Sequence, residues 1–256
     1  MQEQKLQFFT IENLLQASRL AISAQNFITE YEKLILRESE VNTRFQETEA
    51  FRVNMEFINQ QLHWFQKFEQ TKKLIYTDDV TGLYNQRFLK VALKQETDRY
   101  SRYHQPFSLL FIDVDNFKYI NDTFGHLTGS STLTQLGRFL KTQIRNMDLL
   151  FRYGGDEFII ILIGAVAAEA RSIANRLCKK IEQTTFQTHC QRQLKITASI
   201  GVASVPEHAQ DPVSLLKFAD KSMYYSKESG KNQVTVFSPE HFDGMRHDQG
   251  SKTETT

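Results

Sequence analysis

Cysteine is scarce in this sequence, since only Cys178 and Cys190 occur among 256 residues. Their spacing fits neither a disulfide framework nor a metal-binding cluster, which favours a reducing compartment. Proline and glycine are missing from the first part of the chain: the first glycine is Gly82 and the first proline is Pro106. Because these residues are the strongest breakers of regular structure, their absence predicts that residues 1–75 are helical.

Long apolar runs and an excess of one charge are also missing. No stretch approaches the ~20 apolar residues that cross a bilayer, and residues 1–20 contain Glu, Gln and Asn where a signal peptide would be apolar. The 31 Lys and Arg against 30 Asp and Glu give a formal net charge of +1, which creates no general attraction to nucleic acid or anionic lipid. We expect a cytoplasmic protein with no membrane span and no nucleic-acid partner.

Two apolar stripes with helical spacing run through the N-terminal region. The first consists of Leu20, Ala24, Phe27, Tyr31 and Leu34, and the second of Phe51, Met55, Ile58, Leu62 and Phe65. The polar residues 37–49 between them are either a turn of a helical hairpin or a phase shift within one coiled-coil helix. The stripes either pack on each other or dimerise the chain, and we expect a dimerisation and signal-input region.

Beyond Gly82, short apolar runs alternate with helical periodicity. The pattern predicts strands at 107–113, 149–152, 158–163, 196–203 and 233–237, and helices at 86–103, 129–145, 167–182 and 212–228. This order, with one hairpin in the middle, indicates an α/β (α+β) fold with a βαββαβ core, in which helices flank a mixed sheet. We expect a helical region at 1–75, a globular domain at 76–237 and a disordered tail at 238–256.

The segment RYGGDEF at 152–158 places two acids at a glycine turn. Gly154 and Gly155 permit a tight turn, and Asp156 and Glu157 then crowd negative charge at its tip. Asp113 ends the first core strand, so a strand end beside the hairpin tip would bring Asp113 and Asp156 together. With a backbone carbonyl such as that of Val114, these oxygens would suit Mg²⁺ or Mn²⁺.

Basic residues near these acids predict a phosphate site. A helix starting after Asp115 would present its backbone N–H groups and Lys118 to a polyphosphate. Lys227 and Lys231 flank Gly230 in a loop before the last strand and could hold further phosphate oxygens as point charges.

Five motifs in order resemble the GGDEF-domain diguanylate cyclases over residues 76–237. They are DVTGLYNQR at 79–87, DVDNFKYINDTFGH at 113–126, RYGGDEF at 152–158, ASIGVA at 198–203 and ADKSMYYSKESGKN at 219–232. The resemblance implies a palm-like fold akin to nucleotidyl cyclases and polymerases. It also implies condensation of two GTP molecules into cyclic di-GMP, with release of two pyrophosphates, by a homodimer whose two nucleotide sites face each other.

The resemblance also implies a role for each matching residue. The metal ligands would be Asp113, the Val114 carbonyl, Asp156 and Glu157, holding two Mg²⁺ or Mn²⁺ ions per site. Lys118 and the two hairpin acids would be catalytic, with either Asp156 or Glu157 as the base. The substrate would contact Phe117, Lys118, Asn121, Ser130, Lys227 and Lys231, with Asn121 at the guanine edge. Asp79 and Arg87 would tie the incoming helix to the domain.

Ser130 departs from the family pattern, which usually has an aspartate at this position. A carboxylate accepts from guanine N1–H and rejects adenine, whereas a hydroxyl can either donate or accept. The serine resembles a branch of hybrid, promiscuous cyclases that make cyclic GMP-AMP from ATP and GTP. We therefore expect cyclic di-GMP as the main product and cyclic GMP-AMP as the alternative.

Arg145 and Asp148 form an RxxD pattern shortly before the hairpin turn. Its position resembles the inhibitory site of the family, where cyclic di-GMP restrains the enzyme. Arg145 would contact phosphate or a guanine edge, Asp148 would accept from a base N–H pair, and Arg176 would assist from a neighbouring helix. The plainer interpretation is a surface ion pair at the end of a helix. A further alternative is a non-catalytic module that only binds cyclic di-GMP. The sequence does not identify the input signal of the N-terminal helices.

Overall fold

The computed structural model describes residues 71–188 and 193–240, with a few isolated positions between 56 and 67. The chain divides between Ile75 and Tyr76 into two units. The expected dimerisation region at 1–75 lies almost wholly outside the described residues, as does most of the expected tail. In the described part of the chain, no helix is long and apolar enough to cross a membrane.

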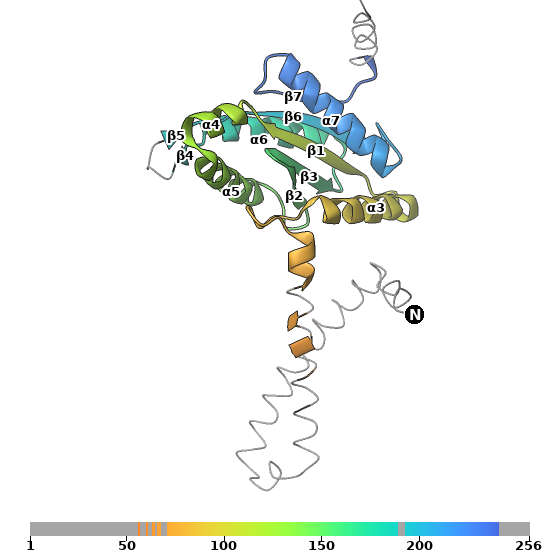
Figure 1. Cartoon of the computed structure of the whole chain (residues 1–256). Coiled ribbons are helices and arrows are strands. Elements are labelled where there is room, and N and C mark those ends of the chain that lie inside the picture. Colours follow the sequence, from red (N-terminus) through yellow and green to blue (C-terminus); the bar gives the residue numbers. More distant parts are fainter. Residues whose placement is uncertain are drawn as a thin grey trace, which may run out of the picture. The chain divides into compact units, whose positions relative to one another are not determined.

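A five-stranded sheet forms the centre of the second unit (Figure 1). Its strands are β1 (Phe107–Val114), β2 (Leu149–Gly154), β3 (Glu157–Ile163), β6 (Ala198–Val205) and β7 (Val234–Val236), in the order β2-β3-β1-β6-β7. β1 is antiparallel to both of its neighbours, whereas β6 and β7 are parallel. The mixed sheet predicted from the sequence is therefore confirmed.

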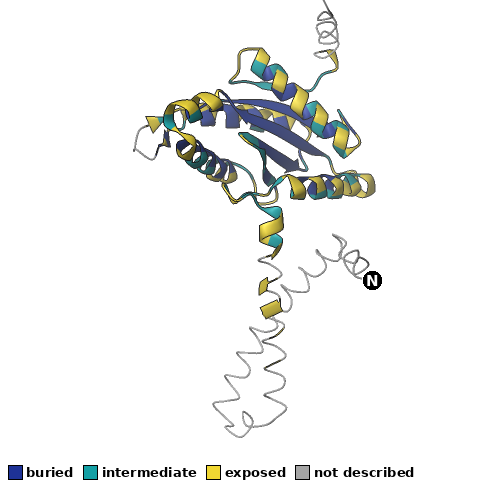
Figure 2. Ribbon diagram, viewed as in Figure 1, coloured by how far each residue is buried: buried dark blue, intermediate teal, exposed yellow. Residues whose placement is uncertain are grey.

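Helices cover both faces of the sheet. α3 (Gln86–Tyr103) and α7 (Pro212–Glu228) share an apolar cluster with Leu109 and Phe111 of β1. On the other face, Leu110 and Ile112 of β1 join a cluster with α4 (Phe117–Phe124), α5 (His126–Gln143) and α6 (Ala167–Gln183). Alternate residues of a strand point to opposite faces, and helices cover both faces here. Every residue of β1 is therefore buried (Figure 2).

Side-chain caps set the helix ends. Asn85 accepts hydrogen bonds from the amides of Arg87 and Phe88, so α3 begins at Gln86 as predicted. The helix predicted at 129–145 begins earlier, at His126, and ends at Gln143. Its end falls earlier because the Arg145 amide donates to the Asp148 carboxylate instead of continuing the helix. A small hairpin of β4 (Phe186–Gln187) and β5 (Gln193–Leu194) was not predicted.

Gly201 lets α7 lie very close to β6. A Cβ atom at this position would lie 2.0 Å from the Ala219 carbonyl oxygen and 2.2 Å from the Met223 nitrogen. These are backbone atoms of a packed helix, so a larger residue would force α7 away from the sheet. The close packing fixes the helix whose last turn carries Lys227.

Candidate active site

The acids of the first strand and of the hairpin lie side by side. Asp113 is directly opposite Glu157 in the antiparallel ladder of β1 and β3. Such opposite residues project from the same face of a sheet. The Val114 amide also donates to the Asp156 carbonyl oxygen, at 3.3 Å, so the hairpin turn is held against the end of β1. The structure thus brings the carboxylates of two distant sequence segments to one edge of the sheet.

Asp113 is almost fully buried and has one positive partner. Its Oδ2 lies 2.7 Å from Nζ of Lys227, and its side chain is 5% exposed. Its Oδ1 is buried and has no hydrogen-bond partner among the described residues. Burial raises the pKa of Asp113 to about 6, and the charges of Asp156 and Asp115 add to this while Lys227 opposes it. The cluster is therefore short of positive charge.

The charged form of Glu157 is disfavoured in the same way as that of Asp113. Burial raises its pKa, and the charges of Asp113, Asp156 and Asp220 raise it further against the opposing effect of Lys227. Asp220, on α7, was not among the predicted site residues. A spacing of seven residues places it two helical turns before Lys227 on the same side of the helix, which is the signal that the sequence did offer.

A divalent cation fits this arrangement. Within residues 71–188 and 193–240 no three His, Cys, Asp or Glu side chains form a ready metal cage. Mg²⁺, however, usually takes only one or two carboxylates from a protein and completes its shell with water and substrate phosphates. The unpartnered Oδ1 of Asp113, beside two further acids, is a donor of this kind. Asp113, Asp156 and the Val114 carbonyl are the residues that could hold such an ion.

Asp115 has a different role from Asp113. Its carboxylate accepts hydrogen bonds from the hydroxyls of Thr197 and Ser199, both at 2.7 Å, and from the Asn232 amide at 3.0 Å. It thereby ties the loop after α7 to the start of β6. Lys231, in the same loop, donates from Nζ to Oδ1 of Asn116 at 2.7 Å.

Three phosphate-binding candidates therefore surround one end of the sheet. Lys231 contacts the residue just before α4, and the exposed Lys118 lies in the first turn of that helix. Lys227 contacts Asp113 at the end of β1. Of the three predicted lysines, Lys227 contacts the acidic cluster, whereas Lys118 and Lys231 lie at the start of α4 or against it.

The two residues expected to read the base lie on the neighbouring helices α4 and α5. A Cβ atom on Gly129 would lie 1.9 Å from Oδ1 of Asn121, so a larger residue at 129 would displace the Asn121 amide. Ser130, which is half-buried, follows directly on α5. Phe117 is 8% exposed and belongs to the apolar cluster beneath α4, so its ring packs in the core. The Phe117 side chain thus anchors the first turn of α4 to the core.

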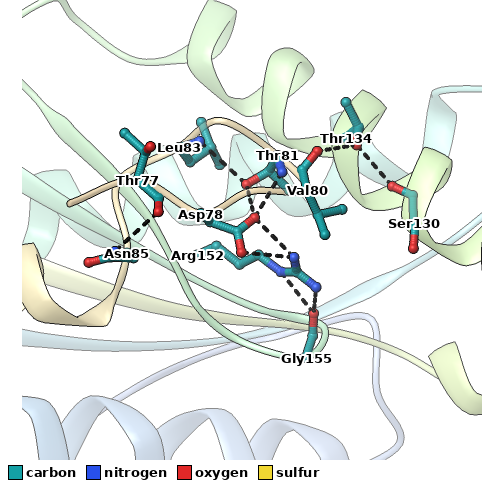
Figure 3. Close-up of polar contacts among 10 residues, drawn as sticks. All are labelled: Thr77, Asp78, Val80, Thr81, Leu83, Asn85, Ser130, Thr134, Arg152 and Gly155. Atoms are coloured by element: carbon teal, nitrogen blue, oxygen red, sulfur yellow. Dashed lines mark hydrogen bonds and ion pairs between the residues drawn. The ribbon is translucent and has the colours of Figure 1, made fainter. Parts of the chain in front are cut away.

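Arg152 links the glycine turn of the hairpin to Asp78 (Figure 3). Its guanidinium donates to both carboxylate oxygens of Asp78, at 2.9 and 3.0 Å, and to the Gly155 carbonyl oxygen. Burial alone would raise the pKa of Asp78, but hydrogen bonds from Thr81 and Arg152 outweigh it and lower the pKa. The structure thus gives the anchoring ion pair to Asp78, whereas the sequence suggested Asp79 for this kind of role.

The RxxD segment forms the turn between α5 and β2. Asp148 is 3% exposed, and its two oxygens accept from the backbone amides of Arg145 and Ile163. Arg145 is exposed, and the guanidinium of Arg176 donates to the Gln143 carbonyl oxygen at 3.1 Å. Arg145 and Arg176 therefore lie at the same helix end, while Asp148 shapes the turn from inside.

A separate cavity lies between the segment before α3 and the hairpin. Neither Asp113 nor Lys227 lines it, so it is distinct from the acidic cluster. Its lining residues are Asp78, Asn85, Gln86, Arg87, Arg152, Tyr153, Gly154 and Gly155.

We expect Asp78→Ala to lower the free energy of unfolding by about 1.5–3 kcal/mol, because it removes charge-assisted hydrogen bonds. Urea unfolding at pH 7 measures this change. The pKa of folded Asp78 is lowered, so its contribution is present at neutral pH and is lost as the pH falls below about 4. The difference from the wild type should shrink there. Asp79→Ala is the matched control, and an equal loss in both variants would contradict the assignment.

Comparison with known proteins gives the same result at the level of the family. Residues 75–233 match the family model described as "Diguanylate cyclase, GGDEF domain". Diguanylate cyclase DosC of Escherichia coli is 37% identical over 169 residues, which are 66% of this chain and 36% of DosC. The chain thus spans little more than a third of the curated relatives that it matches.

Solved structures support the fold assignment. The GGDEF domain of PA1120 (TpbB or YfiN) from Pseudomonas aeruginosa has a TM-score of 0.64 and 30% identity, covering 66% of this chain and 99% of that chain. The GGDEF domain of DgcB from Caulobacter crescentus, solved in complex with c-di-GMP, has a TM-score of 0.60 and 26% identity, covering 63% and 93%. Since the family model covers more than half of the sequence and includes the whole acidic cluster, the chain belongs to the GGDEF domain family.

Proposed function

We propose that this chain is a diguanylate cyclase that condenses two GTP molecules into cyclic di-GMP with release of two pyrophosphates. The observation that carries the proposal is the convergence of Asp113 with Asp156 and Glu157, in a cluster short of positive charge. The match to a diguanylate cyclase domain, and the name of its relative DosC, support the choice of reaction.

The acids of the cluster would bind the metal ions and accept a proton. Asp113, the Val114 carbonyl and Asp156 would hold two Mg²⁺ or Mn²⁺ ions, with Glu157 as a further ligand. When bound, such ions lower the pKa of the ribose 3′-hydroxyl and clamp the α-phosphate for in-line displacement. Asp156 or Glu157 would accept the proton of the hydroxyl.

Substrate binding would come from the elements around the cluster. Lys118, Lys227 and Lys231 would hold the triphosphate, and Asn121 and Ser130 would contact the base. Each domain offers one such site, so two domains must face each other for each 3′-hydroxyl to reach the other α-phosphate. A homodimer formed through residues 1–75 would supply this proximity.

We expect Asp156→Ala to lower the rate of product formation by about 10²-fold or more, because it removes a group that would hold the metal at the reacting phosphate. Chromatography of cyclic dinucleotides formed from GTP and Mg²⁺ measures the rate. Asp98→Ala, on the exposed side of α3, is the control and should keep the wild-type rate. Full activity of Asp156→Ala would refute the metal assignment.

The same assay separates the proposal from a non-catalytic binding module. Such a module would bind cyclic di-GMP but form none from GTP. Retention of product without turnover by the wild-type chain would therefore favour the binding module.

Ser130 favours a second candidate product, because it bears on which base the site binds. Ser130 follows Gly129, whose position is packed against Asn121, so a hydroxyl stands where the family usually has a carboxylate. A hydroxyl can serve either guanine or adenine, and cyclic GMP-AMP from ATP and GTP is the alternative product.

We expect Ser130→Asp to shift the products towards cyclic di-GMP when ATP and GTP are supplied at equal concentration. A charged hydrogen bond contributes about 1.5–3 kcal/mol, so preference for GTP should rise by roughly one to two decades. Mass spectrometry of the products gives the ratio, and Ser131→Asp is a neighbouring control. An unchanged ratio would place base choice elsewhere.

Product feedback at the turn between α5 and β2 is the regulatory part of the proposal. Two exposed arginines, Arg145 and Arg176, lie at one helix end and could pair with the phosphates of cyclic di-GMP. Asp148 would keep the turn in shape through its two backbone contacts, with Arg145 as the main ligand.

We expect Arg145→Ala to raise the amount of product that accumulates without changing the initial rate, since it would weaken the inhibitory site alone. Progress curves followed by pyrophosphate release test this. Lys217→Ala lies on α7, which packs on the opposite face of the sheet, and serves as the control. Identical progress curves for Arg145→Ala and the wild type would remove the feedback site.

A further inference from the structure

Lys227 occupies the carboxylate that the proposed function assigns to a metal ion. Its ammonium group lies 2.7 Å from Oδ2 of Asp113, which is contact distance for a charged hydrogen bond. The side chain of Asp113 is 5% exposed, whereas that of Lys227 is 30% exposed. The lysine can therefore withdraw towards solvent, but the carboxylate cannot follow it.

The neighbouring lysine makes a different kind of contact. Lys231 donates to Oδ1 of Asn116, a neutral side chain, also at 2.7 Å. The two lysines flank the same glycine and are both candidates for phosphate binding. Of the two, only Lys227 contacts a carboxylate among the described residues. They therefore form a natural pair for comparison.

Charge makes Lys227 and a metal ion competitors. The acids of this cluster already suffer from burial and mutual repulsion, and Lys227 is the cation that relieves Asp113 and Glu157. A divalent ion on Oδ1 of Asp113 would lie within a few ångströms of the ammonium group on Oδ2. Like charges at that distance repel strongly where water is excluded. A metal ion on Asp113 is therefore bound less tightly while Lys227 stays on Oδ2.

We propose that Lys227 and the divalent metal ion compete for Asp113, each weakening the binding of the other, and that the nucleotide triphosphate ends the competition by drawing the lysine away. This inference rests on the proposed function, which supplies the triphosphate. Without nucleotide, Lys227 neutralises Asp113 and metal binding is weak. With nucleotide, the phosphate oxygens take the ammonium group and free Oδ2, so metal and nucleotide bind cooperatively.

Manganese binding by the full chain without nucleotide tests the competition directly. Electron paramagnetic resonance of free Mn²⁺, at pH 8, gives the dissociation constant for the wild type, Lys227→Met and Lys231→Met. We expect Lys227→Met to bind Mn²⁺ about tenfold more tightly or better, since a repelling cation is gone. Lys231→Met should match the wild type. Unchanged Mn²⁺ affinity of Lys227→Met, or an equal gain in Lys231→Met, would overturn the proposal.

A second variant guards against loss of folding. Lys227→Arg keeps the positive charge and should bind Mn²⁺ as weakly as the wild type. Circular dichroism on each sample checks that it is folded, and Lys227→Gln replaces Lys227→Met if the latter is not. Tight Mn²⁺ binding by Lys227→Arg would contradict a role of charge.

Addition of a non-hydrolysable GTP analogue tests the second half of the proposal. The analogue should tighten Mn²⁺ binding more in the wild type than in Lys227→Met, because the variant has no lysine to displace. An equal effect on both would refute this coupling. The nucleotide-free comparison does not depend on turnover. Absence of product from GTP would thus refute the proposed function, whereas unchanged Mn²⁺ affinity in an active enzyme would refute only this inference.

Discussion

A carboxylate buried at the end of a central strand must be matched by positive charge, and Asp113 imposes this requirement on the whole site. β1 lies between two antiparallel neighbours and under helices on both faces, so its last residues are removed from water. One oxygen of Asp113 meets Lys227, and the other meets no partner among the described residues. The remaining need for positive charge is what makes this end of the sheet suited to a metal ion.

Two further acids of the same region perform structural work, which leaves the chemistry to their neighbours. Asp115 accepts hydrogen bonds from Thr197, Ser199 and the amide of Asn232, so it fixes the loop that carries Lys231. Asp78 is matched by Arg152, which also holds the Gly155 carbonyl and thereby the hairpin turn. The acidic cluster is thus positioned from both sides by charged groups that are themselves satisfied.

The sequence predicts the architecture well because local signals agree there. The strand and helix order, and the start of α3 after its Asn85 cap, follow from periodicity and capping. The partners of individual acidic side chains were harder to predict. Asp78 and Asp79 are adjacent and alike, and the contacts of Asp78 with Thr81 and with the distant Arg152 distinguish them. The inward direction of Asp148 likewise depends on the Ile163 amide of a neighbouring strand, which no local pattern reveals.

In the proposed function, chemistry and base choice are located on different parts of the fold. The acids and Lys227 belong to the ends of β1 and β3, the turn between β2 and β3, and the last turn of α7. Asn121 lies on α4, against Gly129 of α5, and Ser130 follows Gly129 on that helix. Because no described contact of Ser130 involves the acidic cluster, a change at this position can alter the base that is bound while the reacting groups keep their geometry. Under the proposed function, this separation would let the domain retain its reaction while its nucleotide preference changes.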